Sequence, residues 1–111
     1  MIIFMDWQIK IKAEFDKAEQ ARARGNEGQA RVCARRAAGI AAREYFVRKG
    51  HSIHTPSAYD LLNSLVEDSS LPGELRQSAE YLTLRVNEDF KLPVDVDLIY
   101  EAKKLCKGLS I

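Results

Sequence analysis

The segment from Asn26 to Gly50 contains six alanines, five arginines and no proline. Alanine and arginine both favour helix, and a segment without proline can keep its backbone hydrogen bonds unbroken. Small side chains on one broad face let neighbouring helices approach closely, whereas the long charged arginines must reach solvent. The segment therefore predicts a long helix at the centre of a helical bundle, with a basic flank.

Composition and the distribution of charge narrow the class of protein. The 111 residues are 46% hydrophobic and 30% charged, which is typical of one soluble globular domain. The net charge is only +1, but residues 22–49 hold eight basic and two acidic side chains, and residues 57–97 hold three basic and nine acidic ones. This asymmetry suits either an encounter with a polyanion or a match between the helices themselves, and both interpretations stay open.

Cysteine usage and the apolar start indicate the compartment. Cys33 and Cys106 each lie within an apolar helical pattern, which favours reduced, buried thiols over a disulfide. The apolar run at residues 1–5 is much shorter than a signal-peptide core or a membrane span. We therefore expect a cytoplasmic protein that does not enter a membrane.

Apolar spacing and turn residues predict five helical segments and no strand. The expected fold is all-α, an up-and-down bundle of four to five helices in a single domain over residues 1–111. The first helix runs from about Asp6 to Arg24 and stops at Gly25, a residue that tolerates the left-handed conformation.

The second helix has signals at both ends. Asn26 is the predicted N-cap, with Gln29 three residues later completing a capping box, and Gly50 is the predicted end. Its apolar face predicts contact with several other helices at once.

The remaining helices are shorter. The third is expected to start within residues 55–57 and to end before the turn at residues 68–70. The fourth opens at residues 72–74, and its apolar stripe continues to Val86. The last starts between residues 93 and 96.

The two histidines form a His-x-x-His motif, His51 and His54, in the loop after the second helix. A metal site needs three or four ligands, and the nearest further candidate is Asp60. We expect no metal and no cofactor here, and we favour loop solvation or capping of the third helix for the histidines.

Arg48 and His54 have a spacing that suits cleavage of RNA. Histidine could transfer the proton of a 2′-hydroxyl or of the leaving group while arginine holds the phosphate. Arg48 also suits the C-terminus of its helix, where it can pair with Glu44 one turn earlier. For Glu44, which helical geometry places among alanines, we favour this ion pair or a position at a wet dimer interface over a catalytic carboxylate.

Arginines on two flanks of the second helix are candidates for binding phosphate. Arg31 and Arg35 lie on one flank, and Arg36 and Arg43 lie on another. Guanidinium groups bind phosphate oxygens in a two-pronged geometry, so either flank could hold a nucleotide or an RNA backbone.

Several short motifs occur in a familiar order. The small-residue helix reads AAGIAAREYF at residues 37–46, and the loop with the histidines and the leucine helix DLLNSL at residues 60–65 follow. Next come AEYL at residues 79–82, continuing to Arg85, and an irregular stretch before the closing helix. In this order the chain resembles the HEPN domains (higher eukaryotes and prokaryotes nucleotide-binding) over nearly its whole length.

The resemblance implies a bundle of four to five helices that forms homodimers. Many members of the family work beside a minimal nucleotidyltransferase, and some are toxin-like RNases. The arginine near the end of the family's fourth helix corresponds to Arg85, and RNase members carry a histidine four to six residues later. Residues 86–92 contain no histidine, so that motif is incomplete in this chain.

These observations together favour a homodimeric, HEPN-like binding module for a nucleotide, RNA or a partner protein such as a nucleotidyltransferase-like chain. Two alternatives stay open: a metal-independent endoribonuclease that uses Arg48 and His54, and a purely structural dimerisation module. The predicted ligand-binding residues are Arg36, Arg43, Arg48, His51, His54 and Arg85.

Overall fold

The computed structural model describes residues 5–86, 88 and 91–109 and has five helices. Among these residues no strand occurs, so the prediction of an all-α bundle is confirmed. The helices are α1 (Asp6–Ala23), α2 (Glu27–Arg48), α3 (Ala58–Val66), α4 (Gly73–Leu82) and α5 (Leu98–Gly108).

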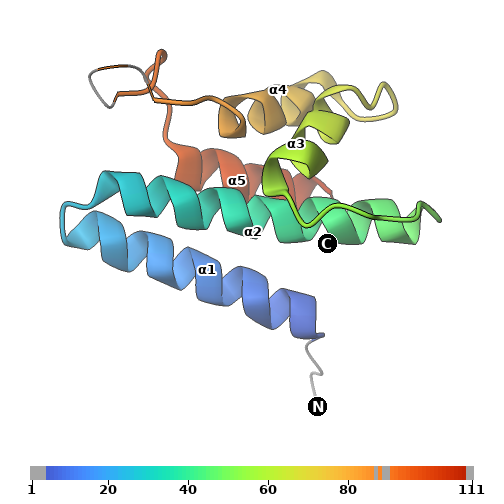
Figure 1. The fold of residues 1–111 in the computed structure, drawn as a ribbon, viewed down its shortest axis with the longest axis horizontal. Coiled ribbons are helices and arrows are strands. Elements are labelled where there is room, and N and C mark those ends of the chain that lie inside the picture. Colours follow the sequence, from blue (N-terminus) through green and yellow to red (C-terminus); the bar gives the residue numbers. More distant parts are fainter. Residues whose placement is uncertain (1–4, 87, 89–90, 110–111) are drawn as a thin grey trace.

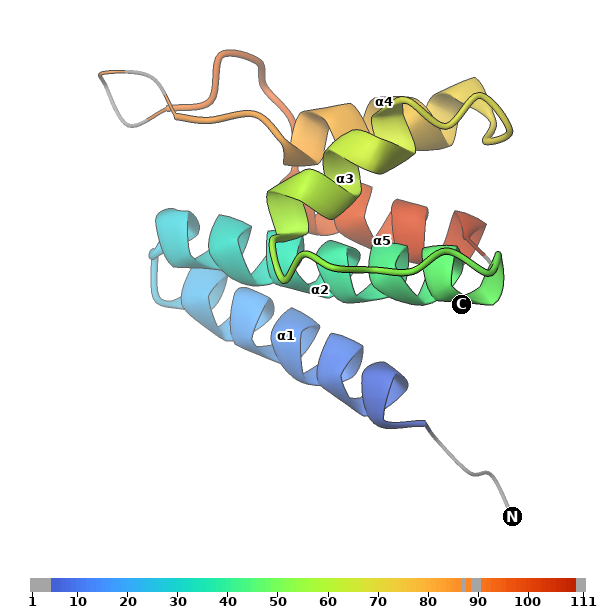
Figure 2. The ribbon, with the colours of Figure 1, turned by 45° about the vertical axis from the view of Figure 1, so that its right-hand side comes forward.

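Helix α2 lies at the centre of the bundle, as predicted. It packs against α1 along one side and against α3 and α5 on the others, while α4 packs on α3 and α5 (Figure 1). Figure 2 shows α2 and α5 running side by side, with α3 and α4 above them and α1 below. The loop after α2 turns back over that helix before α3 begins.

The core joins the small residues of α2 to larger side chains from the other helices. Every alanine of α2 is fully buried, which is what allows several helices to approach α2 closely. Leucines supply the volume on the facing helices. The fully buried leucines are Leu62, Leu65, Leu82, Leu98 and Leu105.

The small-residue face of α2 is covered within one chain. Ala37 on that face has no exposed surface. Helices of the same chain cover this face. It is therefore not a surface for a second copy.

The glycines that follow α1 and α2 both have the predicted left-handed conformation. Gly25 has φ 79° and Gly50 has φ 85°. After α2, the Gly50 N–H donates to the Val47 carbonyl and the His51 N–H donates to the Phe46 carbonyl, each at 3.0 Å. This pair of bonds is a Schellman motif, which satisfies carbonyls left open at the end of the helix.

The caps of α2 and α3 agree with the sequence in part. The Asn26 side chain accepts from the Gln29 N–H at 3.1 Å, so the N-cap is confirmed. The Gln29 side-chain amide lies 3.5 Å from the sulfur of Cys33 rather than completing the box. Ser57 is the N-cap of α3, where its hydroxyl accepts from the Asp60 N–H.

Two boundaries were predicted wrongly. Helix α4 ends at Leu82, and Val86, expected on its buried stripe, is 45% exposed. Helix α5 begins at Leu98 rather than between residues 93 and 96, because Asp97 caps it by accepting from two backbone N–H groups. The irregular stretch between these helices was expected, although residues 87, 89 and 90 lie outside the described residues.

Both cysteines are free, in agreement with the sequence. Cys33 is buried, whereas Cys106 is partly buried in α5. Burial raises the pKa of the Cys106 thiol to about 12, so the group stays protonated at neutral pH. Within the described part of the chain, no helix combines the length and the apolar character that crossing a bilayer requires.

Candidate functional site

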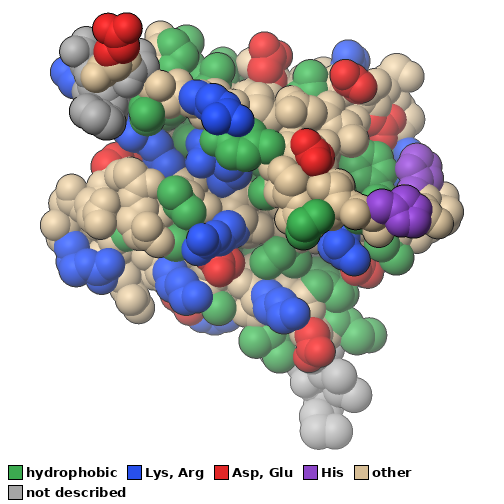
Figure 3. All heavy atoms as spheres, viewed as in Figure 1, with side chains coloured by type: hydrophobic (Ala, Val, Ile, Leu, Met, Phe, Trp, Pro, Cys, Tyr) green, Lys and Arg blue, Asp and Glu red, His purple; other side chains and the backbone are tan. Residues whose placement is uncertain are grey.

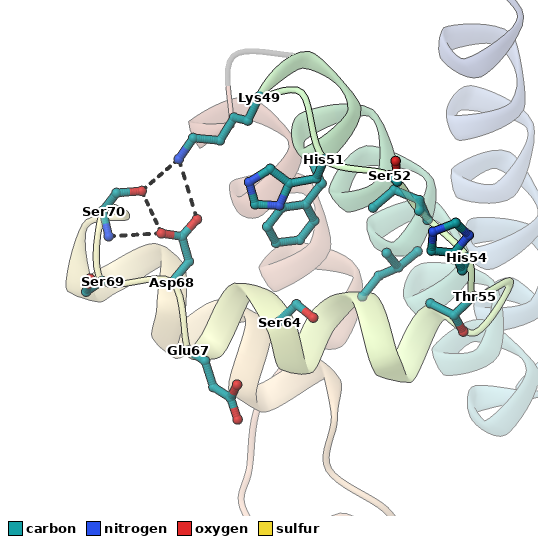
Figure 4. Close-up of a pocket in the computed structure, with 13 residues that line it drawn as sticks. Lys49, His51, Ser52, His54, Thr55, Ser64, Glu67, Asp68, Ser69 and Ser70 are labelled. Atoms are coloured by element: carbon teal, nitrogen blue, oxygen red, sulfur yellow. Dashed lines mark hydrogen bonds and ion pairs between the residues drawn. The ribbon is translucent and has the colours of Figure 1, made fainter.

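A hollow of about 690 Å³ lies where the loop after α2 passes the turn between α3 and α4. Its walls include both predicted histidines. Figure 4 shows His51 in the middle of the hollow, His54 at one end and the cluster of Lys49, Asp68 and Ser70 at the other.

Four polar side chains form a connected network at that second end. Lys49 Nζ donates to the hydroxyls of Tyr45 at 2.8 Å and Ser70 at 2.9 Å. The Asp68 carboxylate accepts from the Tyr45 hydroxyl at 2.9 Å and from the Ser70 hydroxyl at 2.6 Å. The network therefore ties the C-terminal end of α2 to the turn after α3.

The protonation states of this network argue for a structural role. Hydrogen bonds from Ser70 and Tyr45, together with the charge of Lys49, lower the pKa of Asp68 to about 2. The hydrogen bond to Tyr45 raises the pKa of Lys49, so the amine is a cation at neutral pH. Near pH 7 Asp68 is therefore a carboxylate and Lys49 a cation, and the hydroxyls of Tyr45 and Ser70 lie between the two charges.

His51 is positioned by the end of α2. The Schellman turn brings its imidazole over Phe46, with ring centroids 5.5 Å apart and planes inclined by 27°. Contact between these two positions commonly accompanies the turn. Both His51 and His54 are exposed in the loop, and Ser57 rather than either histidine caps α3, so of the two expected roles the structure agrees with loop solvation.

Arg48 points toward α1 rather than into the hollow. Its guanidinium lies 5.2 Å from the centre of the Trp7 ring, and its Nε pairs with Glu44 at 3.4 Å. The predicted ion pair with Glu44 is confirmed. Among the described residues, Arg48 is not one of those that line the hollow of the histidines. Cleavage of RNA by Arg48 and His54 remains a prediction.

Arg85 lies in a different cluster, around Tyr59 at the start of α3. The guanidinium carbons of Arg35 and Arg85 each lie 4.8 Å from the centre of the Tyr59 ring. Arg35 also donates to the carbonyls of Leu82 at 2.7 Å and Leu84 at 3.1 Å, just beyond the last turns of α4.

The charges in this cluster repel one another. Burial lowers the pKa of Arg35, and the positive charges of Arg85 and Arg31 lower it further. Among the described residues, the ion pairs of arginine involve Arg22 and Arg48, not these three side chains. The cluster is thus a local excess of positive charge.

Arg36 and Arg43 line a second, smaller hollow of about 240 Å³. It lies across α2, between Glu14 of α1 and the start of α3, and both arginines are exposed. Figure 3 shows basic side chains crossing the middle of this face, over α2 and the elements on either side. The predicted ligand residues therefore fall into four places rather than one groove: the larger hollow, the smaller hollow, the contact of Arg48 with Trp7 and the contact of Arg85 with Tyr59.

Sequence reasoning missed Tyr59, Glu14 and the network around Lys49. Tyr59 follows a proline-containing loop and precedes the leucines of the third helix, and nothing in that pattern marks it as part of a site. Glu14 occupies one position of an ordinary amphipathic pattern in α1. Their contacts join segments far apart in the chain, so no spacing in the sequence could indicate them.

Comparison with protein families, with curated proteins and with solved structures finds no match to this chain. Within the described residues, no group of three or more histidine, cysteine, aspartate or glutamate side chains is arranged to hold a metal ion.

Proposed function

We propose that this protein is a binding module for single-stranded RNA or a nucleotide, which it engages through phosphate. The single observation that carries the proposal is the pairing of Arg35 and Arg85 on the Tyr59 ring, with the charge of Arg31 also acting on Arg35. Among the described residues, neither Arg35 nor Arg85 forms an ion pair with a carboxylate. The resemblance to HEPN domains supports the same conclusion.

An anion would relieve the repulsion inside this cluster. Guanidinium groups form short, two-pronged hydrogen bonds to phosphate oxygens, and the partly buried position of Arg35 strengthens them. Arg36 lies next to Arg35 in α2, and Arg43 lies two turns further along, so an extended backbone could continue along this helix. The exposed guanidinium groups of both would contact further phosphates.

Fluorescence anisotropy with a short labelled single-stranded RNA tests the proposal. The wild-type chain should bind at low salt, and the logarithm of its binding constant should fall linearly with the logarithm of salt concentration. Arg85→Ala should weaken binding and reduce the magnitude of that slope by roughly 0.7, the value for one phosphate contact on a single strand. Arg36→Ala and Arg43→Ala should act in the same direction.

Arg24→Ala is the matched control. Arg24 is an exposed arginine at the C-cap of α1, away from the cluster around Tyr59. It should change affinity little. If Arg24→Ala and Arg85→Ala weakened binding equally, the contact would be a general charge effect, and absence of binding at low salt would remove the proposal.

We further propose that two copies associate through the outer face of α1. Met5 is 58% exposed and Ile9 is 56% exposed, and Ile9 lines an apolar hollow with Lys12 and Asp16. Lys12 and Asp16 pair within the chain at 2.8 Å. A two-fold arrangement of antiparallel α1 helices would let each Lys12 pair with Asp16 of the partner subunit instead.

Light scattering coupled to size exclusion tests this association. Ile9→Glu should give a monomer, whereas Val94→Glu, an equally drastic change at a site 43% exposed in the segment before α5, should not. A wild-type protein that stays monomeric at the highest soluble concentration would exclude this interface.

A further inference from the structure

Glu14 has a buried oxygen without a hydrogen-bond partner. Its Oε2 atom is inaccessible to solvent and accepts no hydrogen bond from any described residue. The other oxygen, Oε1, lies 3.7 Å from Lys17 Nζ. A buried acceptor that is left unsatisfied lowers stability, so a rotation of the Glu14 side chain that brought Oε2 to a donor in the adjoining hollow would be favoured.

Glu14 lines the smaller hollow, whose walls are of three kinds. Arg36 and Arg43 provide positive charge, and Ile40 and Leu61 provide apolar surface. Gly39 also lines the hollow, at a point where α3 approaches α2 too closely for a larger residue. The hollow thus places a carboxylate with an unsatisfied oxygen beside two arginines and an apolar surface.

We propose that this hollow is a subsite for a nucleobase that carries an exocyclic amino group. The protein would then bind RNA or nucleotides with such a base more tightly than those with uracil. The inference rests on the proposed function.

The chemistry follows from the hydrogen-bonding groups of the bases. The 4-amino group of cytosine is a donor, and carboxylates are its usual acceptors in proteins. Uracil has a carbonyl oxygen at the same place, whose lone pairs would face the Glu14 carboxylate. The apolar walls would accept the ring of either base, and Arg36 and Arg43, which line the same hollow as Glu14, would contact the phosphate.

Cytosine and uracil have nearly the same shape, so oligocytidine and oligouridine of equal length are the probes. The wild-type chain should bind oligocytidine about tenfold more tightly, the size of one good base contact. Glu14→Gln should remove most of this preference, since a side-chain amide can donate to the carbonyl of uracil as well as accept from an amino group. Glu19→Gln is the matched control, because Glu19 is an exposed glutamate of α1 that pairs with Lys103.

A second measurement needs no variant of the protein. Oligomers of N4,N4-dimethylcytidine lack the donor hydrogens and should bind the wild-type chain no better than oligouridine. Equal binding of oligocytidine and oligouridine by the wild type would overturn the subsite and leave the proposed function standing. A preference that persisted in Glu14→Gln, with its fold verified by circular dichroism, would also overturn it. Failure of all oligomers to bind would remove the proposed function itself.

Discussion

Gly39 of α2 lies so close to Ala58 of α3 that a Cβ atom at position 39 would sit 2.7 Å from the Cβ of Ala58 and 3.1 Å from its Cα. Real Cβ contacts are essentially never this short. The glycine therefore sets the distance between the two helices and, with it, one wall of the smaller hollow.

Gly39→Ala tests this close approach. Alanine favours helix over glycine by about 1 kcal/mol, whereas overpacking of a tight contact costs about 1 to 3 kcal/mol. We expect the contact to dominate, since backbone as well as side chain of Ala58 lies in the way, and the free energy of unfolding in urea should fall. Gly28→Ala is the control: its nearest neighbour would be 3.9 Å away, so this variant should be slightly more stable.

Arg35→Ala should destabilise the fold, whereas Arg36→Ala should not. Arg35 donates to two carbonyls at the end of α4 and is half-buried, and hydrogen bonds that involve a charged group are each worth about 1.5 to 3 kcal/mol. Hydrogen exchange should show faster opening of α4 in Arg35→Ala. Equal unfolding free energies for the two variants would show that the α4 contact contributes nothing.

Asp68 should make the free energy of unfolding fall at acidic pH. Its pKa is lowered from 3.8 to about 2 in the folded protein, so its contribution is complete above about pH 4 and is lost as the pH falls through 2. Asp68→Asn should be less stable than the wild type at pH 6, and the difference between them should shrink toward pH 2. Asp95→Asn, which changes an exposed aspartate in the segment before α5, is the matched control and should be about as stable as the wild type at pH 6.

Ala37→Leu should act on the fold of one chain and not on the association of two. Ala37 is fully buried within the chain, and extra volume in a packed site costs about 1 to 3 kcal/mol. Thermal unfolding should show this loss. Ala23→Leu, at an exposed position in α1, should leave the melting temperature nearly unchanged. If Ala37→Leu instead left stability intact and gave a monomer from a dimer, the alanine face would be an interface after all.

The features of the fold that could be predicted depend on near neighbours in the sequence. Gly25 and Gly50 end their helices through bonds to residues a few positions away, and Asn26 caps α2 through Gln29, so local pattern was sufficient. The central place of α2 followed from its alanines, because small residues on a broad face must be covered by other helices.

The wrong boundaries depend on distant partners. The apolar spacing continues past Leu82 to Val86, but Arg35, 47 residues away in the chain, binds the Leu82 carbonyl that the next helical N–H would have used. Asp97 is both the N-cap of α5 and an ion-pair partner of Arg22, 75 residues earlier. No periodicity carries such information.

The candidate sites were predicted only as residue types. Arginine was correctly placed on the surface of α2, but its grouping with Tyr59 and Arg85 depends on the path of the chain between α2 and α5. Arg48 and His54, close in sequence, are separated by the turn after α2, since Arg48 faces Trp7 while His54 borders the hollow.

The position of Glu14 opposite Arg36 and Arg43 has a mechanical consequence. Helix α1 packs mainly on α2, and the smaller hollow spans the seam between these two helices. A molecule bound there would contact both helices, so its free energy of binding would add to the free energy needed to detach α1 from α2. Binding in the smaller hollow should therefore slow amide hydrogen exchange along α1, including at residues that the bound molecule does not contact.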